Sequence, residues 1–104
     1  MRSLEIHSQA ARRVGGNRTY AIVGVVASGN LEVLLERVLD GTACEVNIKT
    51  PVEGFEEIWR AVVADFIERY SPGGLKISLN DLGARPDTVS LRLAQGVRLM
   101  ESGE

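Results

Sequence analysis

The sequence predicts an α+β fold, a two-layer sandwich in which a mainly antiparallel four-stranded sheet carries two helices on one face. The main observation is the order of the periodicities: three strand-like runs, a helix, a fourth strand-like run and a second helix. The chain has 104 residues, of which 44% are hydrophobic and 25% are charged. This size and composition are typical of one soluble globular domain.

The first two strands are predicted on either side of a short turn. Residues 20–27 are β-branched and apolar, which is typical of a strand covered on both faces, and Gly24 indicates a bulge or a close backbone approach. Ser28-Gly29-Asn30 follows, and residues 31–36 form a second strand-like run. Because glycine and asparagine tolerate the positive φ angles of tight turns, this arrangement predicts a β-hairpin.

A third strand and a long helix follow. Cys44, Val46 and Ile48 alternate with polar residues, which predicts a half-buried strand. Residues 50–53 have the spacing of a capping box, although Gly54 shifts the expected helix start to a later residue. The helix is indicated by an apolar stripe at helical spacing, made of Phe55, Ile58, Trp59, Val62, Val63, Phe66, Ile67 and Tyr70.

The C-terminal part contains a fourth strand and a segment that fits two patterns. Leu75, Ile77 and Leu79 alternate with polar residues, and residues 81–87 form a turn in which two aspartates are better explained as turn and cap than as metal ligands. In residues 86–101, positions 89, 91 and 93 alternate as in a strand, whereas positions 89, 93, 97 and 100 lie on one helical face. Length and good helix formers favour a helix.

Residues 1–18 are predicted to be a flexible N-terminal leader, and residues 19–101 the folded domain. The leader ends in Arg12-Arg13-Val14-Gly15-Gly16-Asn17-Arg18, where two glycines stand among arginines with no clear apolar period.

Composition argues against several classes of function. The net charge of −2 and the 5% of aromatic residues give no reason to expect nucleic acid as a partner. No stretch approaches the roughly 18 apolar residues of a membrane-spanning helix, and a single cysteine fits a reducing compartment, so we expect a cytoplasmic protein without membrane insertion. The only histidine, His7, lies in the leader. We therefore expect no catalytic residues and no metal site in the domain.

Ser28 is the candidate functional residue. Its hydroxyl is expected at the tip of the predicted hairpin, and Gly29 leaves room for an approaching enzyme. Turn chemistry alone also explains Ser-Gly-Asn, because all three residues favour turns. Cys44 falls on the apolar face of its strand and is predicted to be a buried structural cysteine rather than a nucleophile.

Two stretches of the sequence resemble one known family. The string VGVVASGNLEVLLE (residues 23–36) resembles the beginning of the acyl carrier (delta) subunit of malonate decarboxylase. The strings NDLGARP (80–86) and VSLRL (89–93) are similar to the same family, and the carrier (gamma) subunit of citrate lyase shares this layout. The resemblance extends from about Tyr20 to Met100.

The resemblance implies a covalently attached cofactor. In that family the serine of the Ser-Gly motif carries 2'-(5''-phosphoribosyl)-3'-dephospho-CoA through a phosphodiester, and the matching residues here are Ser28, Gly29 and Asn30. Acetyl and malonyl are held on its thiol as thioesters. The implied partners are the catalytic acyl-transferase and decarboxylase subunits and the prosthetic-group transferase, and the implied role of the chain itself is that of a non-catalytic carrier in malonate catabolism.

One departure and two alternatives remain open at this point. The family commonly has aspartate where this chain has Asn30. If that aspartate shapes the turn, asparagine replaces it readily. If it contacts the transferase, asparagine would weaken the attachment of the prosthetic group. A citrate lyase-type carrier is the first alternative. The second is an unmodified structural or ligand-binding α+β subunit, in which Ser28 is an ordinary turn residue.

Overall fold

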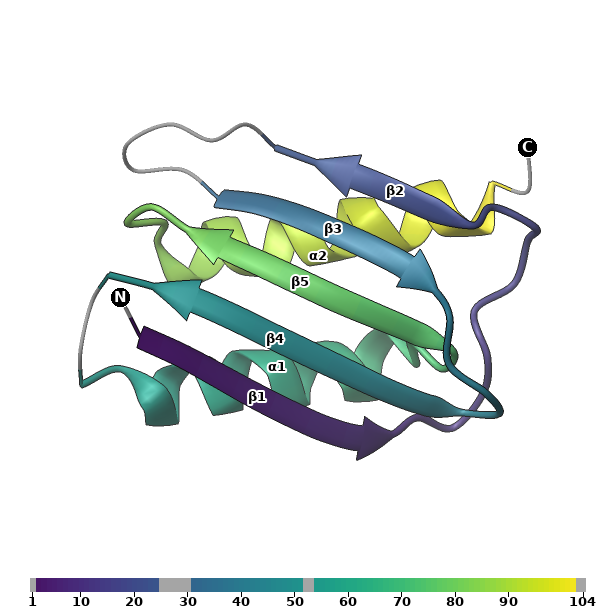
Figure 1. Ribbon diagram of the computed structural model, residues 1–104, viewed down its shortest axis with the longest axis horizontal. Helices are drawn as coiled ribbons and strands as arrows, with labels where there is room; N and C mark the ends of the chain where they lie inside the picture. The colour runs from purple at the N-terminus through teal and green to yellow at the C-terminus, as the bar shows by residue number, and fades with distance from the viewer. Residues whose placement is uncertain (1, 25–30, 52–53, 103–104) are drawn as a thin grey trace.

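The computed structural model describes residues 2–24, 31–51 and 54–102, which form a five-stranded sheet with two helices against one face (Figure 1). The strands are β1 (Arg2–Gln9), β2 (Tyr20–Val23), β3 (Leu31–Arg37), β4 (Ala43–Thr50) and β5 (Leu75–Asp81). The helices are α1 (Glu56–Tyr70) and α2 (Pro86–Glu101). The predicted α+β class with both helices on one face is confirmed, and the sheet has one strand more than predicted.

The strands lie in the order β1-β4-β5-β3-β2. Neighbours are antiparallel except for β4 and β5, which run parallel. A parallel pair needs a long crossover, and here α1 supplies it between the two strands. As a result, β5 is the last strand in the sequence and the central strand of the sheet.

The extra strand corrects the expectation of a flexible leader. β1 pairs with β4 along its whole length, from Arg2 opposite Thr50 to Gln9 opposite Ala43. Leu4 and Ile6 pack against the core, while Glu5 and His7 are on the other face. This alternation has a period of two, but only Leu4 and Ile6 carry it, and two apolar positions are too few to indicate a strand from the sequence.

The rest of the predicted leader is also attached to the folded body. Val14 is only 5% exposed, and its N–H donates to the carbonyl oxygen of Gly73. The guanidinium of Arg37 donates to three carbonyl oxygens of this segment, those of Val14, Gly15 and Arg18. One β3 side chain therefore holds the connection between β1 and β2 in place.

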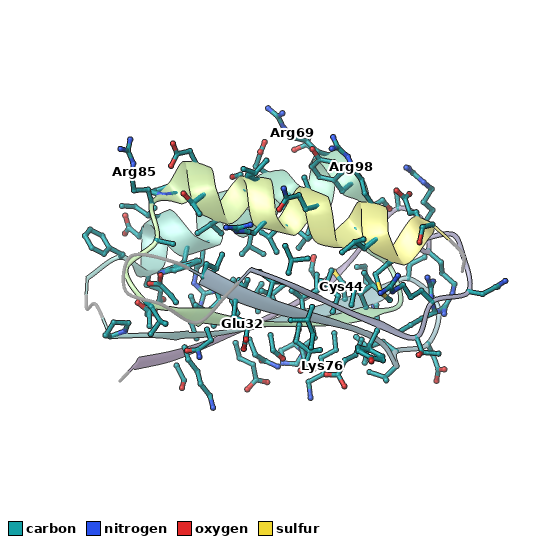
Figure 2. The ribbon with its side chains drawn as sticks, turned by 90° about the horizontal axis from the view of Figure 1, so that it is seen from above. Glu32, Cys44, Arg69, Lys76, Arg85 and Arg98 are labelled. Atoms are coloured by element: carbon teal, nitrogen blue, oxygen red, sulfur yellow. The ribbon has the colours of Figure 1, made fainter. Side chains whose placement is uncertain are left out.

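Alternating side chains divide the sheet into a covered face and an open face. Figure 2 shows Cys44 directed toward the helices, whereas Glu32 and Lys76 are on the opposite side of the sheet. The covered face buries apolar residues of β3, β4 and β5 against both helices. The ambiguous segment is a helix, and its Gly96 lets α2 lie close to the buried side chain of Leu35.

The helix starts differ from the capping-box prediction. Helix α1 begins at Glu56, later than Thr50 and in the direction that Gly54 indicated. Thr50 is instead buried at the end of β4, and its hydroxyl donates to Oδ2 of Asp81 across 2.7 Å. The hydroxyl therefore connects the ends of two parallel strands.

Asp81 is the polar centre of this end of the sheet. Its side chain is 3% exposed, and its Oδ1 accepts hydrogen bonds from the backbone N–H groups of Gly83 and Ala84, at 3.0 and 2.8 Å. With the Thr50 hydroxyl on Oδ2, both oxygens have donors. These hydrogen bonds fix the turn that leads from β5 into α2, because the buried Asp81 carboxylate needs protein donors in place of water.

We expect Asp81→Ala to lower the free energy of unfolding by about 2–4 kcal/mol, because it leaves the buried Thr50 hydroxyl and the part-buried N–H groups of Gly83 and Ala84 without their acceptor. Urea unfolding of the purified chain measures this. Asp65→Ala is the matched control: Asp65 is exposed and bonds only to Arg69 one helical turn away, so about 0.5 kcal/mol or less is expected. Equal costs for the two variants would contradict this role of Asp81.

Candidate functional site

The predicted attachment residues Ser28, Gly29 and Asn30 lie outside the described residues. The strands on either side are described, and they are adjacent and antiparallel, with Tyr20 opposite Glu36 and Val23 opposite Val33. The chain thus leaves the sheet after β2 and re-enters it in the neighbouring strand at Leu31. The two strands of the predicted hairpin are confirmed, with β2 ending at Val23 rather than at residue 27.

This end of the sheet gathers several other chain segments. β4 and β5 end here, β3 begins here, and both helices begin here (Figure 1). Leu31 is directly opposite Asp81 in the β3–β5 pairing. The predicted attachment segment therefore re-enters the fold beside the Asp81 turn, at the start of α2.

Gly24 confirms the predicted close backbone approach. Its φ is +88°, and a Cβ at this position would overlap the carbonyl oxygen of Leu31. Only glycine combines this left-handed conformation with so little space. The residue therefore brings the two ends of the segment, at β2 and β3, into direct contact.

Arg92 places a positive charge at the same point. This α2 side chain is half-buried, and its Nε would be 3.5 Å from a Cβ at Gly24. Its Nη1 also reaches Oε1 of Gln95 at 3.5 Å. The Arg92 guanidinium beside Gly24, the last described residue before the segment, favours a negatively charged group nearby.

Cys44 is placed as the sequence predicts. It is 2% exposed on the covered face of β4, and burial raises the pKa of its thiol. A thiolate is the reactive form, so burial makes this cysteine a poor nucleophile at neutral pH. The structural interpretation of Cys44 is confirmed.

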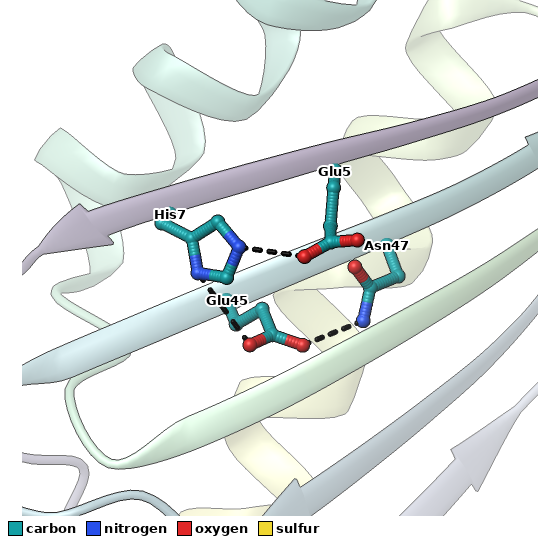
Figure 3. Close-up of polar contacts among 4 residues, drawn as sticks. All are labelled: Glu5, His7, Glu45 and Asn47. Carbon is teal, nitrogen blue, oxygen red and sulfur yellow. Dashed lines mark hydrogen bonds and ion pairs between the residues drawn. The ribbon is translucent and has the colours of Figure 1, made fainter.

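The structure also brings together a polar cluster that the sequence analysis missed. His7 lies between two carboxylates, with Nε2 at 2.7 Å from Oε1 of Glu5 and Nδ1 at 3.5 Å from Oε1 of Glu45, and Asn47 donates to Oε2 of Glu45 at 2.7 Å (Figure 3). The strand register that places His7 opposite Glu45 depends on β1, which was expected to be flexible.

This Glu5–His7–Glu45 cluster is explained by pairing across strands. Its ligand-capable atoms lie within 4.8 Å of one another, but His7 and Glu5 are 63% and 65% exposed on the open face. Polar side chains that face each other across a strand pair, as His7 and Glu45 do, stabilise a sheet by themselves. The cluster is also remote from the attachment segment, because β4, β5 and β3 separate β1 from β2.

Comparison with known proteins identifies the family. The sequence profile of the acyl carrier protein family described as malonate decarboxylase delta subunit matches residues 18–100. The chain belongs to this family. The match includes Ser28 and all the elements from β2 to the C-terminal part of α2.

Individual delta-subunit relatives agree with the family. The malonate decarboxylase acyl carrier protein of Bradyrhizobium diazoefficiens is 61% identical over 105 residues, covering 100% of both chains. That of Xanthomonas campestris pv. campestris strain B100 is 53% identical over 85 residues, or 82% of this chain and 81% of its own. These names favour the malonate family over the citrate lyase alternative.

The fold agrees as well. One chain of the crystal structure of a Pseudomonas malonate decarboxylase hetero-tetramer in complex with malonate matches with a TM-score of 0.83 and 34% sequence identity, covering 96% of this chain and 99% of that one. In this chain, no helix among the described residues has the length and apolar character needed to cross a membrane.

We expect Gly24→Ala to destabilise the chain by about 2–4 kcal/mol, because the new Cβ is both strained and in contact with the Leu31 carbonyl. Gly54→Ala is the matched control: its φ of +87° is nearly the same, but nothing lies within 4 Å of the new Cβ. That control isolates the conformational cost, about 1–2 kcal/mol. Urea unfolding of both variants measures the difference. Equal midpoints for the two variants would contradict the role of Gly24.

Cys44 is expected to react slowly with a thiol reagent in the native chain. A raised pKa lowers the thiolate fraction at a pH below the pKa. At pH 7.5 we expect the reaction with a disulfide reagent to be slower in the native chain than in urea, and to accelerate as pH rises. A Cys44→Ser, Ser90→Cys double variant, with its thiol on exposed α2 surface, is the control; equal native rates would contradict burial.

Proposed function

We propose that this chain is the acyl carrier subunit of a malonate decarboxylase and that Ser28 carries 2'-(5''-phosphoribosyl)-3'-dephospho-CoA through a phosphodiester. This group would supply a thiol on a long arm, on which acetyl and malonyl are carried as thioesters. The observation that carries the proposal is the family match over residues 18–100, which contains the Ser28-Gly29-Asn30 motif.

The described residues next to the segment suit this attachment. A phosphodiester is anionic, and Arg92 and the positive end of the α2 dipole are both near the point where the chain leaves and re-enters the sheet. Gly24 and the β2–β3 pairing hold the two ends of the segment together. This chain's own residues would thus fix the origin of the arm and partly neutralise its charge.

The catalytic groups would come from other subunits. The structural relative is a hetero-tetramer, and we propose that this chain likewise works with acyl-transferase and decarboxylase subunits, after a prosthetic-group transferase has modified it. Carbanion stabilisation would then require a partner's oxyanion hole. A tether also raises the effective concentration of the acyl group at each partner site.

The test is intact mass spectrometry of the chain produced together with its prosthetic-group transferase. We expect a mass increase equal to the mass of phosphoribosyl-dephospho-CoA minus one water, which is the balance of forming the phosphodiester, and no increase for Ser28→Ala. Ser90→Ala is the control, because Ser90 is an exposed serine on α2 and should leave the modification intact.

Two results would count against the proposal. A Ser28→Ala chain that still gains the mass would move the attachment to another residue. A wild-type chain that assembles with the decarboxylase subunits and supports activity without any added mass would identify it as an unmodified structural subunit.

A further inference from the structure

An apolar pocket opens between the first turns of the two helices. Its volume is about 320 Å³, and most of its lining is provided by Phe55, Ile58, Trp59 and Val62 on one side and Ala84 and Pro86 on the other. Phe55 and Ile58 are exposed apolar side chains, at 47% and 46%. Small-molecule pockets commonly begin at about 300 Å³, so this one accepts a short chain-like ligand.

The pocket lies beside the place where the attachment segment re-enters the sheet. Asp81 is part of its lining, and Asp81 is directly opposite Leu31, the first described residue after the segment. Both the pocket and the helix starts are on the covered side of the sheet, at the end where β2 stops and β3 begins. Leu31, where the chain re-enters the sheet after the segment, is therefore one strand away from the strand end that lines the pocket.

The lining determines which part of such an arm fits. The exposed lining is predominantly apolar, and both oxygens of Asp81 are already occupied by donors from Thr50, Gly83 and Ala84. The site therefore offers burial of apolar surface rather than new hydrogen bonds, and a phosphate or ribose would lose hydration there without compensation. The methylenes at the thiol end of the arm and an uncharged acetyl thioester suit it, whereas the two amides of pantetheine keep their hydration only at the open mouth of the pocket.

We propose that this pocket, lined by Trp59 and Ile58, holds the acetyl thioester end of the chain's own prosthetic group. This inference rests on the proposed function. A malonyl group adds a carboxylate, which is costly to bury in an apolar site beside the Asp81 carboxylate. The pocket thus distinguishes the two loaded states: it retains the acetylated arm and leaves the malonylated arm in solvent for the partner subunits.

The single tryptophan of the chain is a built-in reporter. The full chain is prepared in four forms, unmodified, modified with a free thiol, acetylated and malonylated, and each form is verified by intact mass. We expect acrylamide quenching of Trp59 fluorescence to fall at least twofold on acetylation compared with the unmodified chain. Malonylation is expected to return it toward the unmodified value, and the Ile58 methyl signals in NMR should shift in the same pattern.

Ile58→Asp tests the pocket without touching the attachment point. The side chain is 46% exposed, so the fold should be retained, while the new charge should abolish the acetyl-dependent protection of Trp59 and leave the mass gain unchanged. Leu91→Asp is the matched control, since Leu91 is an exposed aliphatic residue on α2 at 56% and does not line the pocket. It should behave as the wild type.

The outcomes separate this inference from the proposed function. Chains with confirmed mass gain whose Trp59 quenching and Ile58 shifts do not respond to acetylation would overturn the pocket assignment and leave the carrier function standing. Protection that appears only when partner subunits are added would overturn it too, because the pocket would then hold a partner side chain. Absence of any mass gain at Ser28 would overturn the carrier function, and this inference with it.

Discussion

The buried carboxylate of Asp81 is the interaction on which this end of the molecule depends. It accepts hydrogen bonds from the end of β4 through Thr50 and from the turn before α2 through Gly83 and Ala84. It is also opposite Leu31 in the sheet and part of the apolar pocket lining. One charged side chain thus sets the relative positions of two parallel strands, a helix start and the re-entry point of the attachment segment. Charge-assisted hydrogen bonds of this kind are stronger and more directional than neutral ones.

Much of the fold follows from local patterns in the sequence. The alternation in β4 and β5 and the apolar stripe of α1 are strong signals, because each is repeated over several turns or residue pairs. β1 is different: Leu4 and Ile6 are its apolar signal, and its stability comes from pairing with β4, which lies far away in the sequence. The buried role of Thr50 was missed as well, because its partner Asp81 is also far away in the sequence. Locally, a hydroxyl before a proline fits a helix cap.

The surroundings of the candidate site were only partly predictable from the sequence. The motif at Ser28 and the close approach at Gly24 are encoded locally, by residue types that turns and tight contacts require. Arg92 and the pocket between Trp59 and Pro86 depend on how α2 packs against the sheet, and no local pattern contains that information. The Glu5–His7–Glu45 cluster likewise exists only through the register of two strands distant in the chain.

The strand order has a consequence for biosynthesis. Because β5 is central yet comes last among the strands, neither β3 nor β4 gains its inner neighbour until the sequence through Asp81 has left the ribosome. Until then the nascent polypeptide exposes two apolar strands whose edges are unpaired on that side, a condition in which aggregation competes with folding. Pairing across the centre of the sheet is thus expected to be a late step in folding, because both contacts of β5 join it to strands made earlier.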